Sequence, residues 1–341
     1  MRSAACILAA LAASPVLAER FDVLFDQPSI DRWMYPFNAS PGTRSTFSVF
    51  GSDRETPTQF DARDGQVLLA FDTDLVIPPG GTRDGYRVLG AEVTLQVANN
   101  LVFRLDTTAD PFTNFLPTSD PRFTADADAG QPIELFGAGF RGGWNEANFV
   151  ENAPFANAGA SFLSPGVRNA FAAEVDASGA VRDASNNPRE GFQAKPFAIG
   201  RVNGLASGAP VPQDSILRFQ VDVADAGIQS YLRRGLDRGR LHLVVSALTL
   251  VQQQAGDFPV FYAKENALVT FGLAQAPRLR IQVETVPACA AFDLDCNGVV
   301  DTGDVAIALL EFGPCAGCPS DVDGTGFVDF GDIALIMLDF G

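Results

Sequence analysis

The chain has 341 residues, 47% of them hydrophobic, which is enough for about two domains with a sizeable core. Its 24 Lys and Arg residues are outnumbered by 41 Asp and Glu residues, so the formal net charge is -17 at pH 7. This charge argues against nucleic acid and anionic membrane surfaces as partners, and it favours solubility and cation binding.

The first 18 residues have the pattern of a secretory signal peptide. Arg2 precedes an apolar run over residues 4–13, and Val16 and Ala18 lie at positions -3 and -1 of the expected cleavage site. The run is shorter than the roughly 20 residues of a membrane-spanning helix, and no later stretch qualifies. We therefore expect export without membrane insertion, to the exterior, the cell surface or the periplasm.

Residues 19–284 alternate apolar and polar side chains in short runs separated by turn signals, which predicts an antiparallel β-sandwich or jelly roll. In residues 279–283, for example, Leu279, Ile281 and Val283 are expected to face inward and their neighbours outward. A short helix is expected over residues 228–234. The candidate strands are residues 21–25, 46–50, 67–71, 88–97, 101–105, 216–223, 241–251, 260–263, 268–273 and 279–283.

Residues 107–214 carry a weaker pattern, rich in Gly, Pro, Asn and Asp. Only residues 133–136 and 197–199 read as strands, so we expect long ordered loops here. Two other segments, residues 66–97 with Val-Leu-Leu-Ala-Phe-Asp and Pro-Pro-Gly, and residues 216–250, are similar to secreted β-sandwich modules of the DNRLRE type, although the naming motif is absent. That resemblance implies a fold like that of carbohydrate-binding modules.

Aromatic side chains are the candidate ligand contacts of this domain. Trp33, Tyr35 and Trp144 could stack on the apolar faces of sugar rings, with Arg141, Asn145 and Glu146 bonding the hydroxyls. The alternative is that Trp33 and Trp144 hold loops onto the core.

Catalytic signals are sparse. His242 is the only histidine, and a position on the solvent face of a strand is expected for it. No Gly-x-Ser-x-Gly motif occurs. A glycosidase needs only two carboxylates, for which Glu134, Glu146 and Glu151 are candidates, but solvated loop glutamates explain them equally well. A further acidic run, with Asp120, Asp126 and Asp128, is either a structural calcium site or an exposed turn.

The C-terminal region contains an internal duplication. Residues 293–313 and 321–341 match at 11 of 21 positions without a gap. Each copy places oxygen-bearing side chains at loop positions 1, 3, 5, 9 and 12 and Gly at position 6, the spacing by which a loop surrounds Ca2+. We expect two calcium sites with these ligands: Asp293, Asp295, Asn297, Asp301, Asp304 and the Val299 carbonyl; and Asp321, Asp323, Thr325, Asp329, Asp332 and the Phe327 carbonyl.

An apolar helix pattern follows each loop, and no helix-forming stretch precedes the first loop. This loop-helix arrangement over residues 289–341 resembles the type I dockerin, in the cysteine-bearing form of secreted planctomycete-like proteins. The resemblance implies attachment to a cohesin-like or cell-surface protein. In dockerins, positions 10 and 11 help choose the partner; here they are Thr302-Gly303 and Phe330-Gly331, which differ from the hydroxyl pairs of cellulosomal forms.

Four cysteines remain after loss of the signal peptide, all in this region: Cys289, Cys296, Cys315 and Cys318. An even number in an exported chain predicts two disulfides, with three possible connectivities. A zinc site at Cys315 and Cys318 is the competing interpretation, which the absence of His here disfavours.

The sequence thus predicts a signal peptide (1–18), a β-sandwich (19–284), a linker (285–288) and a small helical calcium-binding domain (289–341). The function that follows is attachment of the sandwich to a partner or surface assembly, in a polysaccharide-related context by resemblance. The alternatives are a secreted glycoside hydrolase or polysaccharide lyase, and a structural surface protein without a small ligand.

Overall fold

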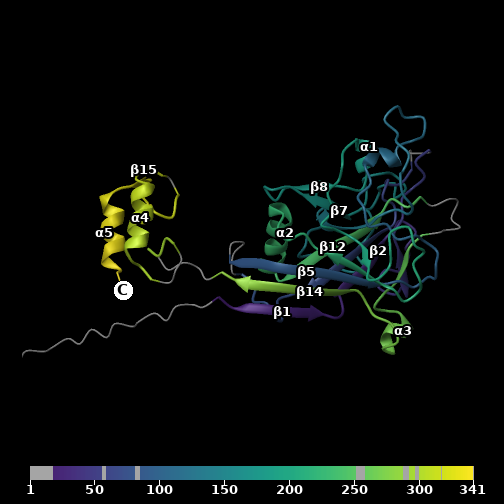
Figure 1. Ribbon diagram of the computed structural model, residues 1–341, viewed down its shortest axis with the longest axis horizontal. Coiled ribbons are helices and arrows are strands. Elements are labelled where there is room, and N and C mark those ends of the chain that lie inside the picture. Colours follow the sequence, from purple (N-terminus) through teal and green to yellow (C-terminus); the bar gives the residue numbers. More distant parts are fainter. Residues whose placement is uncertain are drawn as a thin grey trace, which may run out of the picture. The chain divides into compact units, whose positions relative to one another are not determined.

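The computed structural model describes residues 18–55, 59–80, 85–250, 258–286, 292–295, 299–315 and 317–340. The predicted signal peptide, apart from its last residue, lies outside these ranges, as do Cys289, Cys296 and Asn297. The chain divides into two compact units (Figure 1). The larger unit is Arg20–Glu284, and the smaller one contains Thr285–Gly341.

The larger unit is built mainly from antiparallel strands, as the sequence predicts. One sheet has the order β1-β14-β5-β11-β10, and a second has the order β2-β4-β12-β6-β7-β8, with β9 beside β6. The strands of the first sheet are β1 (Arg20–Phe25), β14 (Arg278–Thr285), β5 (Tyr86–Gln96), β11 (Ile216–Gln220) and β10 (Arg201–Val202). Those of the second are β2 (Ile30–Met34), β4 (Gln66–Asp72), β12 (Arg240–Ala247), β6 (Ile133–Phe140), β7 (Ala170–Val175), β8 (Val181–Asp183) and β9 (Ala198–Ile199).

The main hydrophobic core draws its side chains from both sheets. In β14, Leu279, Ile281 and Val283 are fully buried while Arg280 and Gln282 are exposed, which confirms the predicted alternation. Val93 and Leu95 of β5 belong to the same cluster. Complete burial of each such side chain contributes roughly 1.5 to 3 kcal/mol, so this face accounts for much of the stability of the unit.

A second core lies on the opposite face of the second sheet. Leu68, Phe136 and Val244, from β4, β6 and β12, pack there against Phe149 and Ala153 of a loop. The sheet is therefore buried on both faces, and its outer face is covered by loops from the region between residues 140 and 195. The long ordered loops that the sequence predicts are thus part of the core.

His242 shows the consequence of this second core. The expectation of a solvent-facing histidine is wrong, because its side chain is only 1% exposed and its ring lies edge-on to Phe140 at 5.2 Å between centroids. Neither ring nitrogen has a hydrogen-bond partner among the residues that the structure describes. Burial, with a smaller effect of Arg240, lowers the pKa of His242 to about 3. The folded protein therefore holds this imidazole in its neutral form.

Several elements differ from their predictions. Residues 268–273, predicted as a strand, contain helix α3 (Ala267–Thr270), because the Asn266 side chain caps its first turn by accepting from the Leu268 N–H at 2.9 Å. Residues 101–105, predicted as a strand, make only an isolated bridge, between Arg104 and Pro210. Proline has no backbone N–H, so the facing segment cannot extend this bridge into a regular ladder. Strands β2, β7, β8 and β10 were not predicted. The predicted helix near residue 228 is confirmed as α2 (Ala226–Asp237), capped by Asp225.

The remaining elements of this unit are two short strands and two short helices. Strand β3 (Thr46–Ser48) pairs with β13 (Val260–Tyr262), and the helices are η1 (Phe112–Phe115) and α1 (Asn187–Glu190).

The smaller unit contains helices α4 (Thr302–Leu310) and α5 (Phe330–Leu338) and a short ladder of β15 (Gly313–Pro314) with β16 (Phe327–Val328). Ala308, Val328, Ile333 and Ile336 form its small core. Cys315 and Cys318 form a disulfide, so the competing zinc interpretation of this pair is not supported. Within the described ranges, neither unit has a helix with the length and hydropathy to cross a membrane.

Because the His242 imidazole is buried in its neutral form, we expect the free energy of unfolding to depend on pH. An unfolded histidine has a pKa of about 6.5, so the contribution of neutral His242 is complete above that pH and is lost as the pH falls towards 3. Relative to His242→Leu, wild-type protein should lose about 2 kcal/mol of unfolding free energy between pH 7 and pH 5. Urea unfolding followed by tryptophan fluorescence measures this difference. An equal gap at the two pH values would contradict it.

Candidate metal centres

The first repeat brings three carboxylates together at the start of α4. Asp293, Asp295 and Asp304 each offer an oxygen within 4.8 Å of the others. Asp304 holds the loop and the helix together, since its Oδ1 accepts from the Leu294 N–H at 2.6 Å and its Oδ2 from the Asp301 N–H at 2.8 Å. Asp301 is the N-cap of α4 and completes a capping box with Asp304.

The second repeat has the same arrangement at the start of α5. Asp321, Asp323 and Asp332 form the carboxylate cluster, and Asp332 accepts from the N–H groups of Asp323 at 3.1 Å and Asp329 at 2.8 Å. Asp329 caps the helix as Asp301 does in the first repeat. The duplicated sequence is therefore matched by duplicated geometry.

The electrostatics of both clusters suit a hard cation. Asp304 and Asp332 are fully buried; burial opposes their ionisation, but the backbone N–H groups that they accept from keep the pKa of each below its usual range. Asp321 Oδ1 is buried and has no hydrogen-bond partner within the described part of the chain. No Lys, Arg or His follows Arg280 in the sequence. Acidic oxygens of this kind are ligands that Ca2+ accepts.

The remaining predicted ligands have other contacts as well. Asp301 and Asp329 accept from the Gly303 and Gly331 N–H groups, both at 2.6 Å. The Thr325 hydroxyl donates to the Phe327 carbonyl at 3.2 Å. Val299 lies at the loop of the first repeat, and Asn297 falls outside the described residues.

The three aromatic candidates of the larger unit do not form one strip. Trp33 stacks on Tyr35 with ring centroids 4.6 Å apart, and the Arg44 guanidinium lies 5.0 Å from the Trp33 ring. Trp144 is edge-on to Phe149 at 5.6 Å. Both tryptophans are half-buried against the hydrophobic clusters, an arrangement that agrees with the alternative of loops held onto the core.

The polar residues proposed beside Trp144 also have structural partners. Arg141 pairs with Asp183, and the Asn145 side chain accepts from the Ala147 N–H at 2.9 Å. Sugar binding at these residues remains a prediction.

Each candidate catalytic glutamate has a basic partner of its own. Buried Glu134 pairs with Arg63 at 2.5 Å, Glu146 with Arg238 at 2.8 Å, and Glu151 with Lys264 at 2.7 Å. These partners come from three different parts of the chain. Ion pairing accounts for the placement of all three, so no carboxylate pair for glycoside hydrolysis is identified among them.

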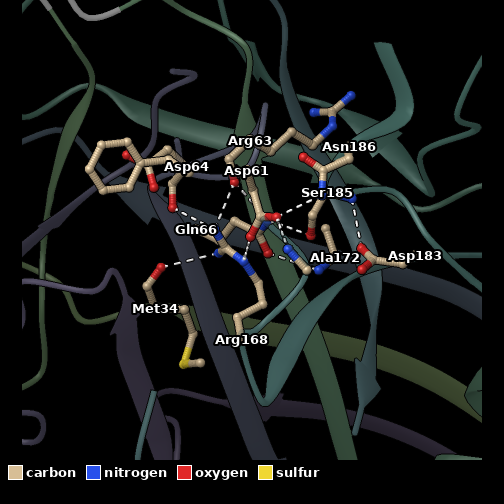
Figure 2. Close-up of polar contacts among 12 residues, drawn as sticks. Met34, Asp61, Arg63, Asp64, Gln66, Arg168, Ala172, Asp183, Ser185 and Asn186 are labelled. Carbon is tan, nitrogen blue, oxygen red and sulfur yellow. Dashed lines mark hydrogen bonds and ion pairs between the residues drawn. The ribbon is translucent and has the colours of Figure 1, made fainter. Parts of the chain in front are cut away.

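A buried polar network lies beneath the loops of the larger unit (Figure 2). The Arg168 side chain is fully buried and donates to Asp61, to the carbonyls of Arg63 at 3.1 Å and Asp64 at 2.9 Å, and to that of Met34. Asp61 also accepts from the Asn186 side chain at 2.6 Å. Because its members are closed to solvent and bonded to one another, this network is structural.

A cavity of about 230 Å3 lies near the same loops. Three arginines line it together with apolar side chains, but each has a partner: Arg122 pairs with Asp120 at 2.9 Å, Arg189 donates to Ser52 at 2.7 Å, and Arg54 donates to the Asn114 carbonyl at 3.0 Å. The guanidinium groups are therefore held by the protein itself, and the acidic clusters are the stronger candidates for function.

Comparison of the chain with protein-family models and with curated proteins finds no match in either case.

The Arg168 network predicts an unequal response to charge removal. Asp61→Ala leaves a buried guanidinium without its counter-charge and should lower the unfolding free energy by ~3 to 5 kcal/mol. Glu284→Ala, which breaks the exposed pair with Arg20, should cost less than about 1 kcal/mol. Chemical denaturation of both variants tests the contrast, and similar losses would contradict the structural role of the network.

Proposed function

We propose that residues 289–341 form a dockerin-like module that binds two calcium ions and attaches the β-rich unit to a partner protein or surface assembly outside the cell. The observation that carries this proposal is the repeated carboxylate cluster, with three acidic oxygens within 4.8 Å at the start of each of two helices. Because the sequence after Arg280 has no basic residue, a cation from solution is the available counter-charge.

The chain's own residues suggest how such ions would act. Asp293, Asp295 and Asp304 would bind in the first loop, and Asp321, Asp323 and Asp332 in the second. Calcium neutralises the crowded carboxylates, so its binding energy adds to the folding energy of a unit with a thin core. Asp304 and Asp332 link ion and helix, since each also accepts the backbone N–H of its helix N-cap.

Exposed apolar side chains on the smaller unit support the proposal that this module binds a partner protein. Leu310 at the end of α4 is 87% exposed, and Leu338 at the end of α5 is 83% exposed. Phe330 is 74% exposed and lies edge-on to Phe312. Large apolar groups gathered on so small a unit are typical of a protein-binding surface. The dockerin resemblance makes a cohesin-like protein the class of partner to test.

Two further observations fit an exported protein. The first 18 residues have the signal-peptide pattern, and the Cys315–Cys318 disulfide suits an oxidising compartment. The resemblance of the β-rich unit to carbohydrate-binding modules makes polysaccharide its proposed context, with the attached unit as the cargo.

Chelation tests the calcium proposal directly. Excess chelator should lower the midpoint of thermal unfolding of the smaller unit in the full chain, because binding to the folded state alone stabilises that state. The variant Asp295→Ala/Asp323→Ala should show no calcium-dependent midpoint for this unit. Calorimetric melting with and without calcium gives both results. An unchanged transition of this unit in excess chelator would contradict the proposal.

The two sites should also differ in affinity. Thr325 offers a single hydroxyl, which bonds to the Phe327 carbonyl, where the first loop has Asn297 with an amide carbonyl. The second site should therefore bind calcium more weakly, and Thr325→Asn should strengthen it towards the affinity of the first. Titration calorimetry resolves the two constants, and equal values in the wild-type protein would refute this expectation.

A further inference from the structure

Three aspartates of the larger unit meet between two loops that are distant from the duplicated repeats in the sequence. Asp106 and Asp110 belong to the connection that follows β5, and Asp128 belongs to the turn before β6. One carboxylate oxygen from each lies within 4.8 Å of the others. The sequence groups Asp120 with Asp126 and Asp128; the structure instead pairs Asp120 with Arg122 at 2.9 Å and brings in Asp106 and Asp110.

Two of these carboxylates are buried with oxygens that nothing satisfies. Asp106 is 2% exposed and Asp110 is 9% exposed, and the Oδ2 atom of each has no hydrogen-bond partner in the described part of the chain. A buried carboxylate without a partner is costly. The Thr108 hydroxyl lies between Asp106 Oδ1 at 2.6 Å and Asp128 Oδ2 at 3.0 Å, and its single proton can serve only one of them at a time.

The neighbouring basic side chains do not neutralise the cluster. Arg104 donates to the Gly208 carbonyl at 2.7 Å, and Arg201 donates to the Thr107 carbonyl at 3.2 Å. Within the described residues, neither arginine therefore forms an ion pair with the cluster.

The two loops are pressed closely together at this point. Gly130 has a φ of +118°, and a Cβ built on it would lie 3.0 Å from the Arg104 carbonyl oxygen and 3.1 Å from Asp106 Cβ. A glycine is therefore required for the turn to approach the other loop. Close backbone approach brings the carboxylates of both loops together despite their repulsion.

We infer that Asp106, Asp110 and Asp128 form a third divalent-cation site, in the β-rich unit, and that calcium is its occupant. All three ligands are hard oxygens and no His or Cys is among them, a set that suits Ca2+ better than zinc. The ion takes the open positions at Asp106 Oδ2 and Asp110 Oδ2 and ties the 106–110 loop to the turn before β6. This site is independent of the two proposed in the smaller unit.

Tryptophan fluorescence separates this site from the others, because both tryptophans, Trp33 and Trp144, lie in the larger unit. In the full chain, calcium at about 100 times its Kd should raise the fluorescence-detected melting midpoint by about 5 °C relative to excess chelator. Asp110→Asn should abolish this calcium-dependent shift. In chelator it should melt no lower than wild type, since the substitution removes a buried unpaired charge.

Two further variants complete the test. Asp128→Asn alters an exposed ligand with little risk to folding and should also lose the shift. Asp120→Asn, a matched substitution in the same region but outside the cluster, should keep it. Calorimetry should count one calcium fewer in Asp128→Asn than in wild type. The proposed site would be refuted if calcium left the fluorescence-detected melting midpoint of the wild type unchanged. It would also be refuted if Asp128→Asn kept the full calcium-dependent shift. Neither outcome depends on the behaviour of the smaller unit.

Discussion

The larger unit depends on hiding a sheet from water on both faces when only one face has another sheet to cover it. Loops cover the other face, and loops carry backbone groups that must find partners once buried. Arg168 meets this requirement, because one guanidinium donates to three backbone carbonyls and to Asp61. Gln66 extends the same solution by accepting from the Ala172 N–H and donating to Ser185 (Figure 2). These buried backbone groups thereby find hydrogen-bond partners.

The two units differ in how they balance the negative charge of their acidic side chains. Every Lys and Arg except Arg2 lies between Arg20 and Arg280, so the larger unit can pair its buried acids with its own cations. Glu134 with Arg63 and Asp61 with Arg168 are examples. Residues 285–341 contain no basic residue, and backbone N–H groups there donate to Asp304 and Asp332 instead. The two acidic clusters of the smaller unit are therefore consequences of where the chain places its cations.

The sequence predicted the features that depend on local pattern. The alternation in β14, helix α2 and the helices after the duplicated loops all follow from residue spacing, and all are present. The sequence did not predict the second core, in which loops cover the outer face of the second sheet. His242 looked like a surface residue because alternation does not reveal whether a loop covers the outer face. Likewise, Asp106 and Asp110 join Asp128 through a loop contact that leaves no periodic signal. Asn266, the N-cap residue of α3, is the local sequence signal that indicates this helix.

The position of β14 bears on how this protein would respond to mechanical load. It lies between β1 and β5 in its sheet, and its last residue leads directly into the smaller unit (Figure 1). A force that separates the two units acts on β14 where the chain leaves the sheet. Force applied along a strand that is bonded on both sides must shear many hydrogen bonds at once. Tension along β14 would therefore be opposed by its hydrogen bonds to both β1 and β5.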